Sequence, residues 1–373
     1  MKDLQIWNGP STSASHVEPE LTRRSFLRTG AAAIGGMAAL AAALAPLREL
    51  ASDEMPNLDQ FLQKHYKEMS PAEMEQALER IRNKVEERYA VRPHLRDVKP
   101  MEGVEFAYAL NLSRCIGCRK CVHACVAENN QSRSPEIQYI RVLEMPRGTL
   151  DVEKGNHHYD QPTVPNADHF YLPVQCHQCA SPPCVKVCPV EATWQESDGV
   201  TVIDYDWCIG CRYCEAACPY WARRFNFAKP NLPKDQLNPN MSYLSNRPRE
   251  KGVMEKCHFC LHRTREGRMP ACVEICPTGA RKFGNVLDPK SEVAEILRTK
   301  RVFVLKEEVG TLPRFFYYFD ERYPNTLDPE ALAIAARLRE EEGDSYGCLP
   351  GAAGPRRDFI AAAKPAWWIG ENA

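Results

Sequence analysis

The sequence has almost no net charge, and the lack of a basic excess excludes several kinds of partner. Over 373 residues, 48 lysines and arginines nearly cancel 49 aspartates and glutamates. A protein that binds nucleic acid or an anionic membrane surface electrostatically needs a basic excess. We therefore expect no nucleic-acid complex. After residue 50 there is also no uncharged apolar run of about eighteen residues, so we expect membrane contact only through a partner protein.

The motifs of a catalytic pocket are absent as well. No glycine-rich phosphate loop opens a helix, and no nucleophile elbow is present. The 10 histidines form no H-E-x-x-H, H-x-x-E-H or C-x-x-C-H arrangement, so we interpret them as surface or supporting residues. The sequence therefore predicts no acid, base or nucleophile and no catalytic residue.

Cysteine, by contrast, is abundant. The chain has 17 cysteines, although a protein of this length needs no disulfides to stabilise its core. All but Cys348 fall into four groups of four: Cys115, Cys118, Cys121, Cys125; Cys176, Cys179, Cys184, Cys188; Cys208, Cys211, Cys214, Cys218; and Cys257, Cys260, Cys272, Cys276. Such regular clustering favours metal ligands over disulfide partners, whose spacing is not constrained.

The spacing within the groups favours iron-sulfur clusters. Groups one and three read C-x2-C-x2-C-x3-C, and groups two and four keep the same C-x2-C start and C-x3-C end. This is the bacterial ferredoxin pattern, in which three cysteines hold one cube and the fourth holds its neighbour. We expect that fourth cysteine about a turn further on, at a helix start. A zinc ribbon is the alternative, but it leaves no role for the C-x3-C ends.

Sequence separation suggests which groups exchange ligands. Only a short hairpin-like stretch, Glu191 to Trp207, separates groups two and three, so these would form one two-cluster module, with groups one and four pairing around it. The expected sets are Cys115, Cys118, Cys121 with Cys276; Cys257, Cys260, Cys272 with Cys125; Cys176, Cys179, Cys184 with Cys218; and Cys208, Cys211, Cys214 with Cys188. Pairing of group one with two and three with four remains an alternative.

Four longer runs carry a family resemblance: RCIGCRKCVHAC, CHQCASPPCVKVCPVEAT, WCIGCRYCEAACPYWARRFNF and CHFCLHRTREGRMPACVEICPTGA. From about Ala107 to Phe319 the chain resembles the four-cluster iron-sulfur subunit of the dimethyl sulfoxide reductase family of membrane-associated complexes. The resemblance implies the same nested pairing and, since all sixteen positions are cysteine, four 4Fe-4S clusters. It also implies a single-electron relay between a membrane quinone-linked integral subunit and a molybdopterin-type catalytic subunit or multihaem cytochrome. Alternatives are a free-standing polyferredoxin shuttle and a redox-sensing regulator.

The predicted fold class is α+β, with two intertwined bacterial-type two-cluster ferredoxin modules. We divide the chain into a signal segment (1–50), a helical arm (51–102), a polyferredoxin core (103–285) and a C-terminal docking tail (286–373). A capping box predicts a helix starting after Ser70. Further predictions are a strand near Gly199–Asp204, surface loops over Glu128–His169 and Lys229–Lys251, helices at Ser291–Thr299 and from Asp328 to before Gly343, and a strand at Arg301–Leu305.

Several residues near the cysteines have two interpretations. His177 and His258 follow the first cysteine of a group and could donate to sulfur. The basic residues Arg212, Arg223 and Arg224 either offset cluster charge or lie on a solvated face. We expect a set of aromatic side chains to pack around the clusters: Trp207, Tyr213, Tyr220, Trp221, Phe225 and Phe227.

The segment Leu21 to Leu47 resembles a twin-arginine export signal. Arg23 and Arg24 precede an uncharged, alanine-rich stretch that is too weakly hydrophobic for a typical bilayer span. This route exports proteins already folded around a cofactor. We therefore expect the protein on the periplasmic side of the cytoplasmic membrane. A retained amphipathic or transmembrane anchor is the alternative.

Replacing both Arg23 and Arg24 by lysine tests this expectation. The variant should accumulate as a cluster-loaded precursor in the cytoplasm, because the twin-arginine pair is the feature that the export route reads. Cell fractionation with iron analysis of each fraction measures the outcome. Export equal to that of the wild type would contradict the assignment.

Overall fold

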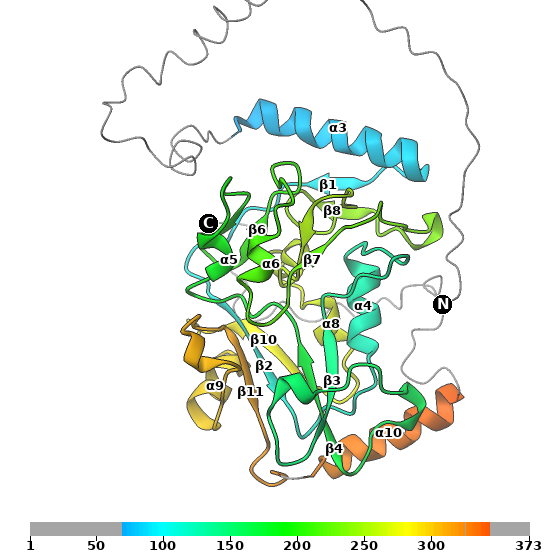
Figure 1. Cartoon of the computed structure of the whole chain (residues 1–373), viewed down its shortest axis with the longest axis vertical. Coiled ribbons are helices and arrows are strands. Elements are labelled where there is room, and N and C mark those ends of the chain that lie inside the picture. Colours follow the sequence, from blue (N-terminus) through cyan, green and yellow to red (C-terminus); the bar gives the residue numbers. More distant parts are fainter. Residues whose placement is uncertain (1–68, 325, 344–373) are drawn as a thin grey trace, which may run out of the picture. The chain divides into compact units, whose positions relative to one another are not determined.

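The computed structural model describes residues 69–324 and 326–343, which form helices and short strands (Figure 1). The helices are α3 (Pro71–Tyr89), α4 (Lys120–Glu128), α5 (Pro183–Lys186), α6 (Tyr213–Ala216), α7 (Leu261–Thr264), α8 (Ala271–Glu274), α9 (Glu292–Thr299) and α10 (Pro329–Glu342). The strands are β1 (His94–Arg96), β2 (Phe106–Asn111), β3 (Arg141–Pro146), β4 (His169–Val174), β5 (Thr193–Gln195), β6 (Thr201–Ile203), β7 (Arg224–Phe225), β8 (Asn240–Ser242), β9 (Met254–Glu255), β10 (Arg281–Asn285) and β11 (Phe315–Tyr318). This mixture of small sheets and helices agrees with the predicted α+β class. The described residues do not include the twin-arginine segment, residues 51–68 of the predicted arm, or Cys348.

The strands that flank the cysteine groups pair in a regular way. In three antiparallel pairs, the strand that enters a group joins the strand that leaves the previous group: β4 with β3, β6 with β5, and β9 with β7. The fourth pair closes the series, because β2 enters group one and β10 leaves group four. The predicted hairpin between groups two and three is therefore confirmed, and groups one and four are brought together by β2 and β10.

In the three-stranded sheet β10-β2-β11, β2 is the central strand (Figure 1). Every residue of β2 is buried. The ring of Tyr108 stacks on that of Phe315, with centroids 4.6 Å apart and planes 6° from parallel, while Phe106 stacks on Phe283. Buried aromatic pairs of this kind add to the hydrophobic stabilisation. The strand β11, which lies in the predicted C-terminal tail, is therefore part of this sheet.

The three predicted helices outside the cysteine groups are confirmed. Helix α3 starts with the expected capping box between Ser70 and Glu73, and it buries Leu78 and Val85. Ser291 caps α9. Asp328 caps α10, which ends at Glu342. Their N-cap side chains satisfy backbone N–H groups that a helix start leaves unpaired.

The predicted strand at Arg301–Leu305 is wrong. Only Phe303 forms a bridge, with Tyr317, and the chain turns at Leu305 toward a short 3-10 helix at Glu307–Val309. The place beside β2 is taken by β11. The apolar run at 301–305 therefore contributes one bridge and packing contacts instead of a strand.

The prediction that both inserts are surface loops is confirmed for most of residues 147–163, which are exposed or half-buried, but it is wrong for other parts of both inserts. Asn130, Asn238 and Asn246 are all buried. The Asn130 amide donates to the carbonyl oxygens of Asn238 and Asn246, each at 2.9 Å, and its oxygen accepts the Asn238 N–H at 2.8 Å. Buried backbone groups need such partners. These polar residues therefore join the two inserts inside the protein instead of exposing them.

A buried ion pair joins the inserts to strand β9. The guanidinium of Arg249 donates from Nε to Glu255 at 2.6 Å and from Nη1 to the Asn129 carbonyl at 2.8 Å, and both charged side chains are 1% exposed. The Tyr139 hydroxyl and the Asn226 amide donate to the two Glu255 oxygens at 2.7 and 2.8 Å. One carboxylate thus accepts hydrogen bonds from three separate segments.

Replacing Glu255 by glutamine should destabilise the protein strongly. The change leaves Arg249 buried without its counter-ion, which costs about 3–5 kcal/mol in the free energy of unfolding. Glu250→Gln is the matched control, because Glu250 pairs with Lys84 at the surface and such pairs contribute at most about 1 kcal/mol. Anaerobic urea unfolding of the cluster-loaded protein measures both. Equal destabilisation by the two variants would contradict this account.

Candidate metal centres

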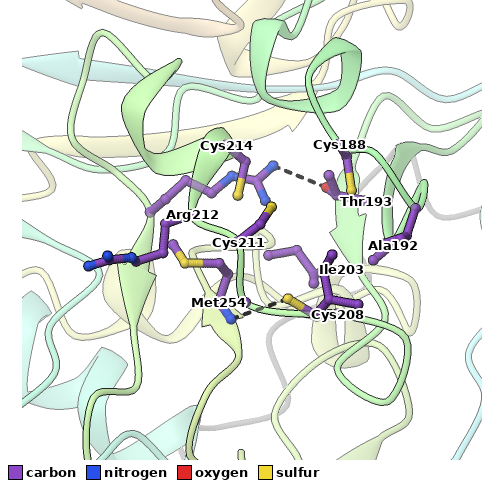
Figure 2. Close-up of a pocket in the computed structure, with 13 residues that line it drawn as sticks. Cys188, Ala192, Thr193, Ile203, Cys208, Cys211, Arg212, Cys214 and Met254 are labelled. Carbon is purple, nitrogen blue, oxygen red and sulfur yellow. Dashed lines mark hydrogen bonds between the residues drawn. The ribbon is translucent and has the colours of Figure 1, made fainter. Parts of the chain in front are cut away.

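Four thiols from two cysteine groups surround one pocket near the surface. Figure 2 shows Cys208, Cys211 and Cys214 around this pocket together with Cys188 of the preceding group. The backbone N–H of Met254 donates to the Cys208 sulfur at 3.5 Å. Because Cys211 is exposed, this site reaches the protein surface.

Two further pockets have the same composition. One is lined by Cys176, Cys179 and Cys184 with Cys218. The other is lined by the first three cysteines of group one, Cys115, Cys118 and Cys121, with Cys276 of group four. In each pocket, three thiols come from one group and one from its partner.

The remaining four thiols also lie together. Cys125 has Cys257, Cys260 and Cys272 as its electrostatic neighbours. The amide of Asn129 donates to the sulfurs of both Cys125 and Cys260, at 3.4 and 3.7 Å. All sixteen cysteines of the four groups are therefore arranged in four sets, and each set combines the residues that the nested pairing groups together.

The local structure explains how one group serves two sets. The third cysteine is the second residue of α4, α5, α6 or α8, namely Cys121, Cys184, Cys214 and Cys272. The fourth cysteine follows four residues later, within α4 or just after the shorter helices. Our expectation that the fourth cysteine lies at a helix start is therefore wrong. Four helical residues rise by about 6 Å along the axis, and this displacement places the fourth cysteine at a neighbouring set.

Glycine is needed in two of the cysteine loops. Gly117 and Gly210 have positive φ angles of 73° and 70°. A Cβ at Gly117 would lie 2.5 Å from the Tyr171 ring, and one at Gly210 would overlap the carbonyl oxygen of Gly252. Both positions combine a left-handed backbone with close packing, which only glycine tolerates. The C-I-G-C sequence therefore matches the turn that brings its two cysteines together.

The buried thiols need a positive ion to become thiolates. Burial raises the pKa of Cys115, Cys179 and Cys260 to about 12, and that of Cys214 to about 11. Without a metal these thiols stay protonated at neutral pH. A coordinated metal removes the proton outright. No three His, Cys, Asp or Glu side chains in the described part of the chain converge as ligands of a single metal ion. Four soft sulfur donors around each site fit an iron-sulfur cube.

Cysteines of different sets interact electrostatically, and these interactions place the four sets in one order. Cys121 of the first set interacts with Cys272 of the second. Cys257 of the second set interacts with Cys176 of the third, and Cys184 of the third with Cys214 of the fourth. The order runs from the Cys115 set, through the Cys257 and Cys176 sets, to the Cys208 set at the surface.

Amide side chains, and not the predicted histidines, contact the sulfurs. His177 is hydrogen-bonded to the Tyr317 hydroxyl at 3.2 Å, and His258 to the Ser245 hydroxyl. Burial lowers the pKa of His177 to about 3, so its ring is neutral. Gln131 donates to the Cys125 sulfur at 3.2 Å and Gln175 to the Cys257 sulfur at 3.7 Å. These amides were missed because they lie outside the cysteine runs or directly before them.

The predicted aromatic shell is largely wrong. Tyr220 is buried and Phe225 half-buried, but the other four side chains expose large fractions of their surface: Trp207 46%, Tyr213 62%, Trp221 40% and Phe227 64%. The sequence predicts their proximity to the cysteines but not the side of the loop from which they project. These four side chains therefore form part of the outer surface.

The three predicted arginines have different environments. Arg212 is exposed and lies over the rings of Phe225 and Phe227. Arg224 donates to the Gln138 carbonyl at 3.1 Å. Arg223 is buried and lines the pockets of both the Cys176 and Cys208 sets. Of the three, only Arg223 is buried, while Arg212 lines the pocket of the Cys208 set and Arg224 interacts with Cys218.

Two further buried cations, Arg281 and Lys256, were missed. The sequence does contain a pattern that predicts Arg281. The last cysteines of groups three and four, Cys218 and Cys276, each begin the same sequence, C-P-x-x-A-R. Arg223 and Arg281 thus occupy equivalent positions in the internal repeat. Lys256 directly precedes Cys257 and has no such signal.

Comparison with known proteins identifies the family. Two sequence profiles, each described as a 4Fe-4S dicluster domain, match residues 107–192 and residues 167–237 with 240–286. A selenate reductase subunit of Mesobacillus selenatarsenatis is 37% identical over 309 residues, which cover 79% of this chain and 96% of the relative. The chain belongs to the four-cluster iron-sulfur subunits of the dimethyl sulfoxide reductase family. The predicted four 4Fe-4S clusters are confirmed, and the zinc alternative is wrong.

Other members of this family have related names. The iron-sulfur subunit 1 of the Hdr-like menaquinol oxidoreductase of Archaeoglobus fulgidus is 38% identical and covers 57% of this chain and 82% of its own length. A tetrathionate reductase subunit of Salmonella typhimurium is 36% identical and covers 57% of this chain and 71% of its own length. The protein described here is an electron-transfer subunit. Among its described residues, every helix is too short or too polar to cross a bilayer.

Proposed function

We propose that the subunit passes single electrons along a row of four clusters with exchanged ligands. The observation that carries this proposal is the arrangement of sixteen thiols in four linked sets. The assigned ligands are Cys115, Cys118, Cys121 and Cys276 for cluster 1; Cys257, Cys260, Cys272 and Cys125 for cluster 2; Cys176, Cys179, Cys184 and Cys218 for cluster 3; and Cys208, Cys211, Cys214 and Cys188 for cluster 4. The clusters supply the redox chemistry, while the chain orients, buries and electrically tunes them.

The two ends of the row would meet different partners. A relative named as a menaquinol oxidoreductase subunit supports a quinone-linked integral membrane subunit on one side. Relatives named as selenate and tetrathionate reductase subunits support a molybdopterin-type catalytic subunit, or a multihaem cytochrome, on the other. The exposed thiol of Cys211 makes cluster 4 accessible to one of these partners. The subunit itself would touch the membrane only through its partner.

Location is part of the same proposal. The twin-arginine pattern at Arg23 and Arg24 supports export of the folded, cluster-loaded subunit to the periplasmic side of the cytoplasmic membrane. A complex assembled there would place the clusters between the quinone pool and an exported catalytic partner. The free-standing polyferredoxin shuttle remains the competing function.

Purification from native membranes distinguishes the complex from the shuttle. An affinity-tagged full-length subunit is extracted with detergent under anaerobic conditions. An integral membrane protein and a large cofactor-containing protein should co-purify with it in fixed proportion. Addition of a quinol should then reduce the clusters of the complex. An untagged strain is the control for adventitious binding. A tagged subunit that emerges alone in the soluble fraction would contradict the proposal and favour the shuttle.

A further inference from the structure

Three buried cations lie at the three junctions between neighbouring cysteine sets. Arg281 interacts with Cys121 of set 1 and Cys272 of set 2. Arg223 interacts with Cys184 of set 3 and Cys214 of set 4, and it lines both of those pockets. Arg281 is 3% exposed and Arg223 is 2% exposed. Each guanidinium therefore faces thiols from both sides of one junction.

Lys256 occupies the remaining junction. Its neighbours are Cys257 of set 2 and Cys176 of set 3, and the side chain is 2% exposed. Its ammonium donates to the carbonyl oxygens of Thr201 and Cys257. The Lys256 ammonium is therefore held by neutral carbonyl groups and lies between ligands of sets 2 and 3.

These cations differ from the other buried arginines in their partners. Arg249 and Arg265 form ion pairs with Glu255 and Asp198, at 2.6 and 2.7 Å. Within residues 69–324 and 326–343, the cations at the junctions have only neutral hydrogen-bond partners. Arg223 donates to the Thr193 hydroxyl at 3.0 Å. Arg281 donates to Tyr108 and Gln175, each at 3.0 Å.

Part of their hydrogen-bonding capacity is also unused by the protein. Nη1 of Arg223 and Nη2 of Arg281 are buried and have no partner among the described residues. A buried charge without a counter-ion and with an unsatisfied donor is strongly unfavourable. An anion beside each guanidinium would remove both costs. The clusters are the anions that the adjacent thiols are suited to hold.

The charge of an iron-sulfur cluster depends on its redox state. With four thiolate ligands a cubane is an anion, and reduction adds one more negative charge. A nearby cation therefore stabilises the reduced form more than the oxidised form, and it raises the reduction potential. A cation between two clusters acts on both, and it also weakens the repulsion between neighbouring reduced clusters.

We propose that Arg281, Lys256 and Arg223 are inter-cluster cations, each of which raises the reduction potentials of the two clusters at its junction. This inference rests on the ligand assignment of the proposed function. Arg281 tunes clusters 1 and 2, Lys256 clusters 2 and 3, and Arg223 clusters 3 and 4. The three residues are positioning and tuning groups, and electrons pass between the clusters themselves.

Redox titration followed by electron paramagnetic resonance tests this pattern. The full-length variants Arg281→Gln, Lys256→Gln and Arg223→Gln each remove one charge. Each should shift two of the four reduction waves to lower potential. The waves shifted by Arg281→Gln and Arg223→Gln should have no member in common, and Lys256→Gln should share one wave with each.

Two kinds of control separate charge from packing. The charge-conserving variants Arg281→Lys, Lys256→Arg and Arg223→Lys should keep the potentials close to those of the wild type. Arg212→Gln is the matched control, because Arg212 also lines the pocket of the Cys208 set but has an exposed side chain, whose charge water screens. It should shift the waves much less than Arg223→Gln. Iron and sulfide analysis of each variant verifies that all four clusters are present.

The possible outcomes are distinct. Four intact clusters with unchanged potentials in the glutamine variants would overturn the inference and leave the proposed function standing. Shifts of all four waves by every variant would also overturn it, because the effect would not belong to one junction. Loss of clusters in all three glutamine variants, but not in the charge-conserving ones, would replace tuning by a role in cluster assembly. Absence of four clusters in the wild type would contradict the proposed function itself.

Discussion

The exchange of the fourth thiol between cysteine groups is the constraint on which the rest of the structure depends. A group can supply a neighbouring set only if the backbone segments around both are held side by side. The antiparallel pairs β2-β10, β4-β3, β6-β5 and β9-β7 provide this contact at every group. The bond from Arg114 Nε to the Thr278 carbonyl, at 2.7 Å, adds a direct link between groups one and four. Segments 164 residues apart in sequence thus form one site.

Burial of the cysteine sulfurs disfavours their thiolate form, and two features of the site compensate for this effect. Because desolvation raises the pKa of the thiols, the thiolate form depends on the metal. Cations and amide donors then stabilise the remaining negative charge, as seen for Arg223, Arg281 and Gln131. The buried carboxylates of Glu255 and Asp198 are neutralised by Arg249 and Arg265.

Sequence patterns predicted the parts of the structure that depend on local rules. Cysteine spacing predicted the clusters, and the caps at Ser70, Ser291 and Asp328 predicted three helices. The inserts were mispredicted because Asn130, Asn238 and Asn246 are typical loop residues, and only the tertiary structure provides the backbone groups that they satisfy when buried. Arg281 could have been found by comparing the repeats, since it follows Cys276 at the distance at which Arg223 follows Cys218. The outward projection of Trp207 and Phe227 has no comparable signal.

The most direct test of ligand exchange is the iron and sulfide content of paired cysteine variants. Cys188→Ala and Cys211→Ala should each lose iron from cluster 4, and the double variant should lose no more than that one cluster. Combining Cys188→Ala with Cys179→Ala should instead affect two clusters, so that the losses add. The account would be contradicted by the reverse result, in which the losses add for Cys188 with Cys211 but not for Cys188 with Cys179. That result would mean that each group holds its own cluster.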